Sequence, residues 1–217
     1  MIIAIDGPSG SGKSTIAKIL AKKLNISYLD TGAMYRAIGY FVLKQGIDPA
    51  DEQNVVPAIK KIDMNVWDEN GVQQVTVNGE NVTPYIRENK ISMAASTVSK
   101  IPAVRLKLVE LQRAIAGKND CVIDGRDIGS YVLPNADYKF YMTADSRIRA
   151  QRRQAELALK GENIPLDVLQ DEIEKRDYQD KNRTFAPLVC CDDAIIIDSS
   201  GLSIDEVSDI VLKTVCK

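Results

Sequence analysis

Residues near the start of the chain have the types and the spacing needed to bind a phosphate group. Residues 7 to 14 match the pattern G-x-x-x-x-G-K-[ST] without a gap. Glycines permit backbone conformations closed to other residues, so that neighbouring N–H groups can converge on one anion. Lys13 is expected to reach the β- and γ-phosphates of a nucleotide, and the Ser14 hydroxyl is expected to bind Mg²⁺. The residues expected to bind the nucleotide are Gly7, Pro8, Ser9, Gly10, Ser11, Gly12, Lys13, Ser14 and Thr15.

The segments on either side of this loop favour the strand and the helix that such a loop requires. Four apolar residues, 2 to 5, precede it, and Ile16, Leu20 and Leu24 follow it at a spacing of four with lysines between them. The start of that helix adds a partial positive charge at the loop. The alternative, a glycine-rich turn that binds nothing, does not explain why motif and context agree.

A hydroxyl and an arginine follow the second predicted strand, residues 26 to 29. Thr31 is expected to cap a helix that runs to about Gln45 and is closed by Gly46, and Arg36 lies early in that helix. Ligands of open α/β sheets bind at the carboxyl edge of the strands, where these two residues would lie. A plain helix cap beside a surface arginine explains the same pattern equally well.

Further charged residues follow a third buried strand, Cys121 to Asp124. Arg126 and Asp127 come directly after it and are candidates for a site, with a charged surface turn as the alternative. A predicted helix over 145–160 is rich in arginine, and a turn at 161–165 separates it from a second predicted helix over about 166–181. They could form a mobile lid that carries Arg176, Asp180 and Arg183, or a solvated charged hairpin.

The whole chain predicts one α/β fold. Strand candidates at 2–5, 26–29, 121–124, 137–143 and 194–197 alternate with helices, which favours a mostly parallel sheet with right-handed crossovers. Residues 62 to 86 differ, because two short alternating runs flank turns at 68–71 and 78–79 and predict a small antiparallel insert. Helical patterns fill residues 87 to 118, with a break near Ile101 and Pro102, and Ser203 is expected to cap a last helix ending near Val215.

Composition excludes several classes of protein. The 217 residues carry a net charge of −2, so no broad basic face for nucleic acid is expected. The absence of histidine excludes histidine catalysis and histidine metal ligation. The cysteines at 121, 190, 191 and 216 form no C-x-x-C pair, which favours free thiols in a reducing compartment. With no signal peptide and no long apolar run, a cytoplasmic protein is expected.

The motifs outside the first loop narrow the choice among phosphate-loop proteins. A GTPase would need N-K-x-D, whereas residues 89 to 92 read Asn-Lys-Ile-Ser. A motor or helicase ATPase would usually need a longer chain. Residues 7–13, 30–36, 124–129 and 176–183 together resemble those of bacterial cytidylate kinases, and the likeness extends from end to end, the antiparallel insert included.

This resemblance implies transfer of a phosphoryl group from ATP to CMP or dCMP, with Mg²⁺ as cofactor. It implies one P-loop kinase domain over residues 1–217, with a five-stranded parallel core at 1–35, 87–148 and 182–217. A nucleotide-monophosphate region at about 36–86 and an arginine-rich lid at about 149–181 would complete it. A monomer acting on small molecules, without nucleic acid or membrane, is expected. The alternatives are a kinase for another small acceptor, such as UMP or shikimate, and a nucleotide-binding module without catalysis.

The resemblance also implies roles for individual residues. The residues implied in catalysis are Lys13, Arg126, Asp127 and Arg183, and Ser14 would bind the metal. The acceptor phosphate would be held by Thr31, Arg36, Arg126 and Arg183, cytosine by Ser96, Arg105 and Asp127, and the ribose by Arg176 and Asp180. Two departures concern Thr31, where some members have serine, and Ser14, where some have glycine. The first retains the hydroxyl, and the second makes metal binding by Ser14 less secure than the role of Lys13.

Overall fold

The computed structural model describes residues 1–69, 71–159 and 161–216. It divides into two compact units. The first consists of Met1–Ile26 and Asp120–Lys217, and the second of Ser27–Asn119. Within the described ranges, no helix is both long enough and apolar enough to cross a membrane.

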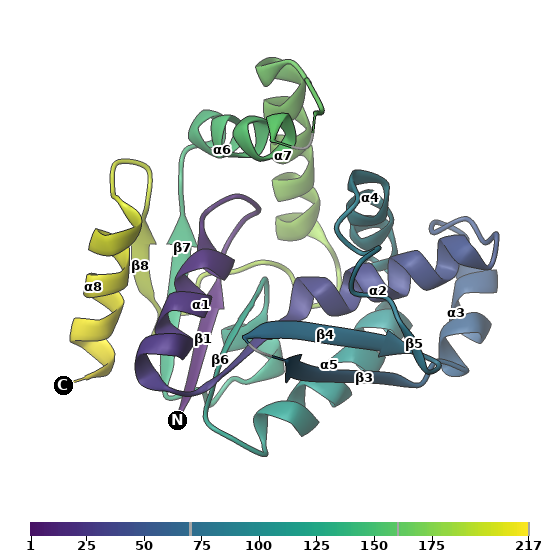
Figure 1. Ribbon diagram of the computed structural model, residues 1–217, viewed down its shortest axis with the longest axis horizontal. Coiled ribbons are helices and arrows are strands. Elements are labelled where there is room, and N and C mark those ends of the chain that lie inside the picture. The colour runs from purple at the N-terminus through teal and green to yellow at the C-terminus, as the bar shows by residue number, and fades with distance from the viewer. Residues whose placement is uncertain (70, 160, 217) are drawn as a thin grey trace. The chain divides into compact units, whose positions relative to one another are not determined.

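Parallel strands form the centre of the first unit (Figure 1). They are β1 (Ile2–Asp6), β6 (Cys121–Gly125), β7 (Tyr138–Thr143) and β8 (Ile195–Asp198). β1 pairs with β6 on one side and β7 on the other, and Ile3, Ala4 and Ile5 are fully buried, as a central strand requires. With β2 (Ser27–Asp30) the sheet has five strands in the order β2-β6-β1-β7-β8, which confirms the predicted five-stranded parallel sheet.

Four α-helices and one π-helical turn complete the first unit. They are α1 (Lys13–Leu24), η1 (Ile128–Val132), α6 (Ser146–Ala158), α7 (Leu166–Asn182) and α8 (Ile204–Val215). α6 and α7 pack against each other around Ala150, Leu157, Leu169 and Ile173. They correspond to the two helices predicted at 145–160 and 166–181. Lys160, where the first of these was predicted to end, lies outside the described residues. The expected cap of α8 is confirmed, because Ser203 and Glu206 form a capping box.

The second unit combines helices with the antiparallel insert. Its further elements are α2 (Thr31–Lys44), α3 (Glu52–Lys60), β3 (Met64–Glu69), β4 (Val72–Val77), β5 (Glu80–Asn81), α4 (Asn89–Val98) and α5 (Pro102–Ala116). β3, β4 and β5 form an antiparallel sheet, which confirms the insert and adds one short strand. Asn78 and Gly79 join β4 to β5 with φ of 52° and 81°, the left-handed pair that a tight hairpin favours. Asn70, at the other predicted turn, lies outside the described residues.

One predicted cap is wrong. α2 is capped by Asp30, whose side chain accepts a hydrogen bond from the Ala33 N–H, and Thr31 is the first residue of the helix. Both residue types are good caps. Asp30 takes the position because it still has an extended backbone, with φ −81° and ψ 96°.

Candidate active site

The phosphate-binding loop (residues 7–14) has a backbone that only glycine permits at three positions. Gly7, Gly10 and Gly12 have φ of 145°, 75° and 90°. A Cβ at Gly7 would lie 1.9 Å from the carbonyl oxygen of Met142, so the loop approaches β7 too closely for any side chain there. Gly12 is the N-cap of α1, which places the start of that helix at the loop.

The carbonyl oxygens of this loop are held by side chains of its own unit. Those of Pro8, Ser9, Gly10 and Ser11 accept hydrogen bonds from Lys13, Arg149, Arg152 and Ser199 at 2.7, 3.1, 3.5 and 3.0 Å, respectively. Peptide N–H and C=O groups point in opposite directions, so fixing four consecutive carbonyls also fixes the direction of the intervening N–H groups. The loop is therefore shaped before any anion binds.

Lys13 is buried among groups of both charges. Burial and the neighbouring charge of Arg126 together lower the pKa of its ammonium to about 7, against the opposing effect of Asp124 and Asp6. A bound polyphosphate would add negative charge and favour the protonated lysine. This property suits a group that stabilises a transferring phosphoryl group.

A hydroxyl and a carboxylate meet next to the loop. The Ser14 Oγ donates to Oδ2 of Asp124 at 2.7 Å, and Asp124 is the fourth residue of the buried strand β6. Mg²⁺ takes oxygen ligands and is usually bound through one or two carboxylates together with substrate phosphates. The pair fits such an ion. Asp124 was not among the predicted ligands, although an acid at the carboxyl end of a buried strand was the signal that could have identified it.

Two arginines and two aspartates form an ion-pair cluster after β6 and at the end of α7. Arg126 Nε donates to Oδ2 of Asp180 at 2.9 Å, and Arg183 lies 3.3 Å from Asp127 Oδ1 and 3.7 Å from Asp180 Oδ1. Burial raises the pKa of Asp180, but Arg126, Arg176 and Arg183 outweigh it and hold the pKa below its usual range. The structure thus brings together the predicted residues Arg126, Asp127, Asp180 and Arg183, with Arg176 close enough to act on Asp180.

A buried carboxylate holds the turn that carries Arg126 and Asp127. Asp6, the last residue of β1, accepts hydrogen bonds from the N–H groups of Ile128 and Gly129 at 2.8 and 2.7 Å. Burial raises its pKa to about 6 despite these bonds. The turn continues into η1, a single π-helical turn of the kind that often occurs at functional sites. Sequence analysis did not identify Asp6, because it reads as the end of a strand.

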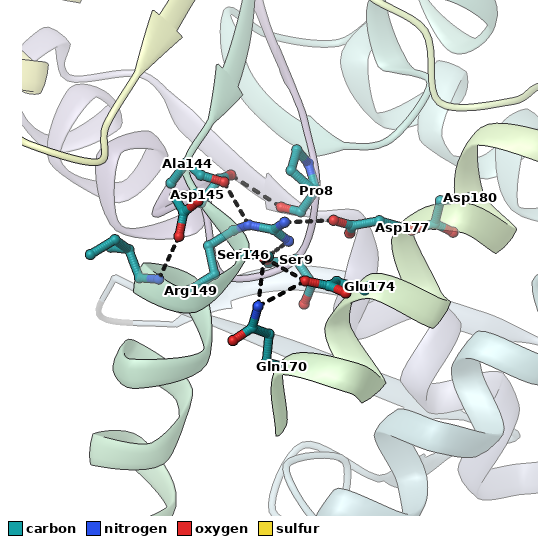
Figure 2. A network of polar contacts seen from close by, with 12 residues as sticks. Pro8, Ser9, Ala144, Asp145, Ser146, Arg149, Gln170, Glu174, Asp177 and Asp180 are labelled. Atoms are coloured by element: carbon teal, nitrogen blue, oxygen red, sulfur yellow. Dashed lines mark hydrogen bonds and ion pairs between the residues drawn. The ribbon is translucent and has the colours of Figure 1, made fainter. Parts of the chain in front are cut away.

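Arg149 of α6 connects α7 to the phosphate-binding loop (Figure 2). Its guanidinium donates to the carbonyls of Ala144 and Ser9 at 2.9 and 3.1 Å and to Oδ2 of Asp177 at 2.6 Å. Figure 2 shows the guanidinium between these groups, with α7 supplying Asp177 from the opposite side. Asp177 lies next to Arg176, so this contact also holds the part of α7 that carries the predicted ribose-binding residues. Sequence analysis noted the arginine cluster but not this connection.

In the second unit, the start of α2 is held through Asp30. Its Oδ1 accepts from the Ala33 N–H, and its Oδ2 forms an ion pair with Arg36 at 2.9 Å. Thr31 is buried and follows directly. The guanidinium of Arg36 folds back over Gly32, where an added Cβ would lie 3.0 Å from one of its nitrogens. Thr31 and Arg36 are thus neighbours on one helix start.

The residues predicted to recognise cytosine in this unit lie on α4 and α5. Arg105 is only 1 % exposed. Its guanidinium lies 5.5 Å from the centre of the Tyr35 ring and donates to the Ser99 carbonyl at 3.4 Å. Ser96 is half-buried on α4. A fully buried arginine in contact with an aromatic ring is typical of a recognition site rather than of a surface charge.

Comparison with known proteins agrees with this geometry. The family model described as cytidylate kinase matches residues 3–217. A cytidylate kinase of Caldicellulosiruptor bescii is 49 % identical over 97 % of this chain and 93 % of its own, and one of Clostridioides difficile is 47 % identical over 99 % and 98 %.

Among solved structures, a gluconokinase from Sinorhizobium meliloti 1021 is similar in fold. It has a TM-score of 0.51 and 11 % identity, and the likeness covers 99 % of this chain and 90 % of that one. At this identity the likeness shows the fold alone. The match of the family model over almost the whole length, together with relatives near half identity, shows that the chain belongs to the cytidylate kinase family.

Proposed function

We propose that the protein transfers the γ-phosphoryl group of ATP to CMP or dCMP, giving ADP and CDP or dCDP. The observation that carries this proposal is the set of site residues that the first unit contains. The phosphate-binding loop with Lys13 and the cluster of Arg126, Asp127, Asp180 and Arg183 belong to the same unit, and Arg126 is close enough to lower the pKa of Lys13. Membership of the cytidylate kinase family supports the same reaction.

Residues of the first unit bind ATP in this proposal. The segment from Gly7 to Thr15 surrounds the phosphates, and Lys13 neutralises the charge that develops on the transferring group. Ser14 and Asp124 hold Mg²⁺, which supplies further positive charge at the phosphate oxygens when bound. No strong general base is needed, because the acceptor phosphate is already ionised. The absence of histidine is then no obstacle.

The acceptor nucleotide is bound through its phosphate, its base and its ribose. Thr31 and Arg36 hold its phosphate together with Arg126 and Arg183, because planar guanidinium groups bind phosphate oxygens in pairs and stay charged. The cytosine is recognised by Ser96, Arg105 and Asp127, and the ribose by Arg176 and Asp180. Arg36, Arg126 and Arg183 are paired with aspartates, and the acceptor phosphate would take over part of these interactions.

The helices α6 and α7, within residues 149–181, act as a lid over ATP in this proposal. Their packing on each other around a separate apolar core suits movement as one body. Closure would exclude water, which would otherwise hydrolyse ATP. We propose a single catalytic domain over residues 1–217 that acts as a monomer in the cytoplasm, where its nucleotide substrates occur.

A coupled assay of ADP release tests the proposal. ATP and Mg²⁺ are supplied with CMP, dCMP, UMP, AMP, dTMP or shikimate as acceptor, and CMP and dCMP should give the highest kcat/KM. A higher value for UMP or shikimate would assign the site to a different acceptor. ADP release with none of the acceptors would leave a nucleotide-binding module.

A further inference from the structure

The side-chain amide of Gln73 holds the backbone of Asp30 from both sides. The Asp30 N–H donates to Oε1 of Gln73 at 2.7 Å, and Nε2 of Gln73 donates to the Asp30 carbonyl at 3.1 Å. Gln73 lies on β4 of the antiparallel insert, and Asp30 is the last residue of β2, within the same unit. A primary amide presents one donor edge and one acceptor, so it replaces the peptide group that a neighbouring strand would offer.

Asp30 is the residue through which the start of α2 is positioned. Its carboxylate caps the helix at Ala33 and pairs with Arg36, and Thr31 follows it in the chain. A movement of the Asp30 backbone would displace the cap, the guanidinium of Arg36 and the hydroxyl of Thr31 together. The two hydrogen bonds from Gln73 oppose that movement.

We infer that Gln73 is a positioning residue for the acceptor phosphate, and that the antiparallel insert acts on the reaction through it. The inference rests on the proposed role of Thr31 and Arg36 in binding that phosphate. Gln73 itself contacts no substrate and acts through Asp30. The insert therefore does more than enlarge the second unit, because one of its strands fixes the residue on which the proposed acceptor site depends.

The adjacent residue provides a matched control. Gln74 has the same side chain on the same strand, but successive residues of a strand face opposite sides. Its Oε1 accepts a hydrogen bond from Nδ2 of Asn81 at 3.1 Å, within the insert. Replacing either glutamine by leucine removes an amide of similar size from β4, but only one replacement releases Asp30.

The experiment compares steady-state kinetics of Gln73→Leu and Gln74→Leu with CMP and ATP varied separately. Loss of two hydrogen bonds should raise the KM for CMP roughly tenfold in Gln73→Leu and leave the KM for ATP unchanged. Gln74→Leu should match the wild type in both. In an Arg36→Ala background, Gln73→Leu should raise the KM for CMP by a smaller factor than in the wild type, because the part of its effect that acts through Arg36 is already lost.

Gln73→Glu extends the test and serves if the leucine variant does not fold. A carboxylate still accepts from the Asp30 N–H but turns a second acceptor toward the Asp30 carbonyl and repels it, so a rise in the KM for CMP with an unchanged KM for ATP is expected here too. An equal rise for CMP and ATP, or a lower unfolding temperature with unchanged kinetics, would overturn the inference. If Arg36→Ala itself leaves the KM for CMP unchanged, the proposed acceptor site fails. If Arg36→Ala raises it and Gln73→Leu does not, only the role of Gln73 fails.

Discussion

The two units hold their charged residues in different ways. In the first, Arg126, Asp127, Asp180 and Arg183 share their contacts, and their side chains are 18 %, 6 %, 10 % and 8 % exposed. In the second, Arg36 forms the ion pair with Asp30 described above, and the side chains of the two residues are 24 % and 17 % exposed. Charge that stabilises a transition state works best when it is fixed in advance. In the proposed reaction Arg126 and Arg183 have this role in addition to binding the acceptor, whereas Arg36 only binds the acceptor and is held by a more exposed ion pair.

The largest effect is expected from removing the central charge of the first unit. Lys13→Ala should lower kcat by roughly a hundredfold to a thousandfold, because it deletes a donor aimed at the transferring phosphoryl group. The unfolding temperature should change little, since burial already disfavours the charged form of this lysine. Lys22→Ala, an exposed lysine of the same helix, is the control. Turnover at the wild-type level in Lys13→Ala would contradict the assignment of the loop.

The second prediction concerns Asp6, whose burial in the first unit should make the free energy of unfolding depend on pH. Its pKa is about 6 in the folded protein against an ordinary value of 3.8, so the folded state binds more protons between these pH values. Asp6 should therefore lower the free energy of unfolding by about 2 kcal/mol as pH rises from 4 to 7. Asp6→Asn should lack this slope, measured by urea unfolding across that range.

An exposed aspartate of α8 provides the control for this measurement. Asp209→Asn should retain the pH dependence of the wild type. A wild-type slope in Asp6→Asn as well would show that Asp6 is not the group responsible.

The third prediction separates base recognition from charge within the same cluster. Ionised Asp127 only accepts hydrogen bonds, so it would bind the C4 amino group of cytosine and repel the C4 carbonyl of uracil. Asp127→Asn can turn either a donor or an acceptor to the base. It should lose CMP activity and narrow the CMP-to-UMP ratio of kcat/KM by about 1–3 kcal/mol, roughly fivefold to a hundredfold.

Asp180→Asn is the matched control, because it removes a negative charge from the same cluster, next to Arg126 and Arg183. Its activity should fall without a change in the ratio of the two acceptors. If Asp127→Asn also keeps the ratio, Asp127 does not read the base, and its role is confined to Arg183.

The fourth prediction compares the two units directly through the free energy of unfolding. Arg126→Lys removes the planar fork that donates to buried Asp180 and should cost about 1–3 kcal/mol. Arg36→Lys acts on a half-buried pair and should cost under about 1 kcal/mol. Urea unfolding of both variants at one pH measures the difference. Equal losses would remove the contrast between a rigid and a lightly held site.

The smallest change is expected in the motion of the lid. Amide hydrogen exchange in residues 149–181 should slow severalfold when non-hydrolysable ATP and CMP analogues bind together. α8, in the same unit but outside this segment, should change less. Identical exchange in the lid with and without both ligands would contradict closure.

Sequence reasoning succeeded where the signal is local. The phosphate-binding loop, the five strands and the insert depend on spacing within a few residues, and each is present in the structure. It missed α3, a short helix that contains Pro57 and in which Val55 and Ile59 are the only buried residues, so its apolar pattern is weak. It also misplaced the cap of α2, because two adjacent residues were both good caps.

The candidate site was predictable in its residue types but not in its connections. Arg126 and Asp180 are 54 positions apart, and only the folded chain brings them together. Gln73 carries no chemical signal in the sequence, since a glutamine on a half-exposed strand is ordinary. Its importance arises from the one backbone it contacts. Such positioning residues are recognised from hydrogen bonds in the structure, because their side chains do none of the chemistry themselves.

The hydrogen bonds to the four carbonyls of the phosphate-binding loop couple nucleotide affinity to the stability of segments far along the chain. Ser199 and Arg152, which hold two of them, follow the loop by more than 130 residues. By thermodynamic reciprocity, a nucleotide that favours the shaped loop must also stabilise the segments that shape it. ATP would then stabilise α6, which carries Arg152, and the segment after β8, which carries Ser199. A destabilising substitution in either segment would appear first as weaker ATP binding.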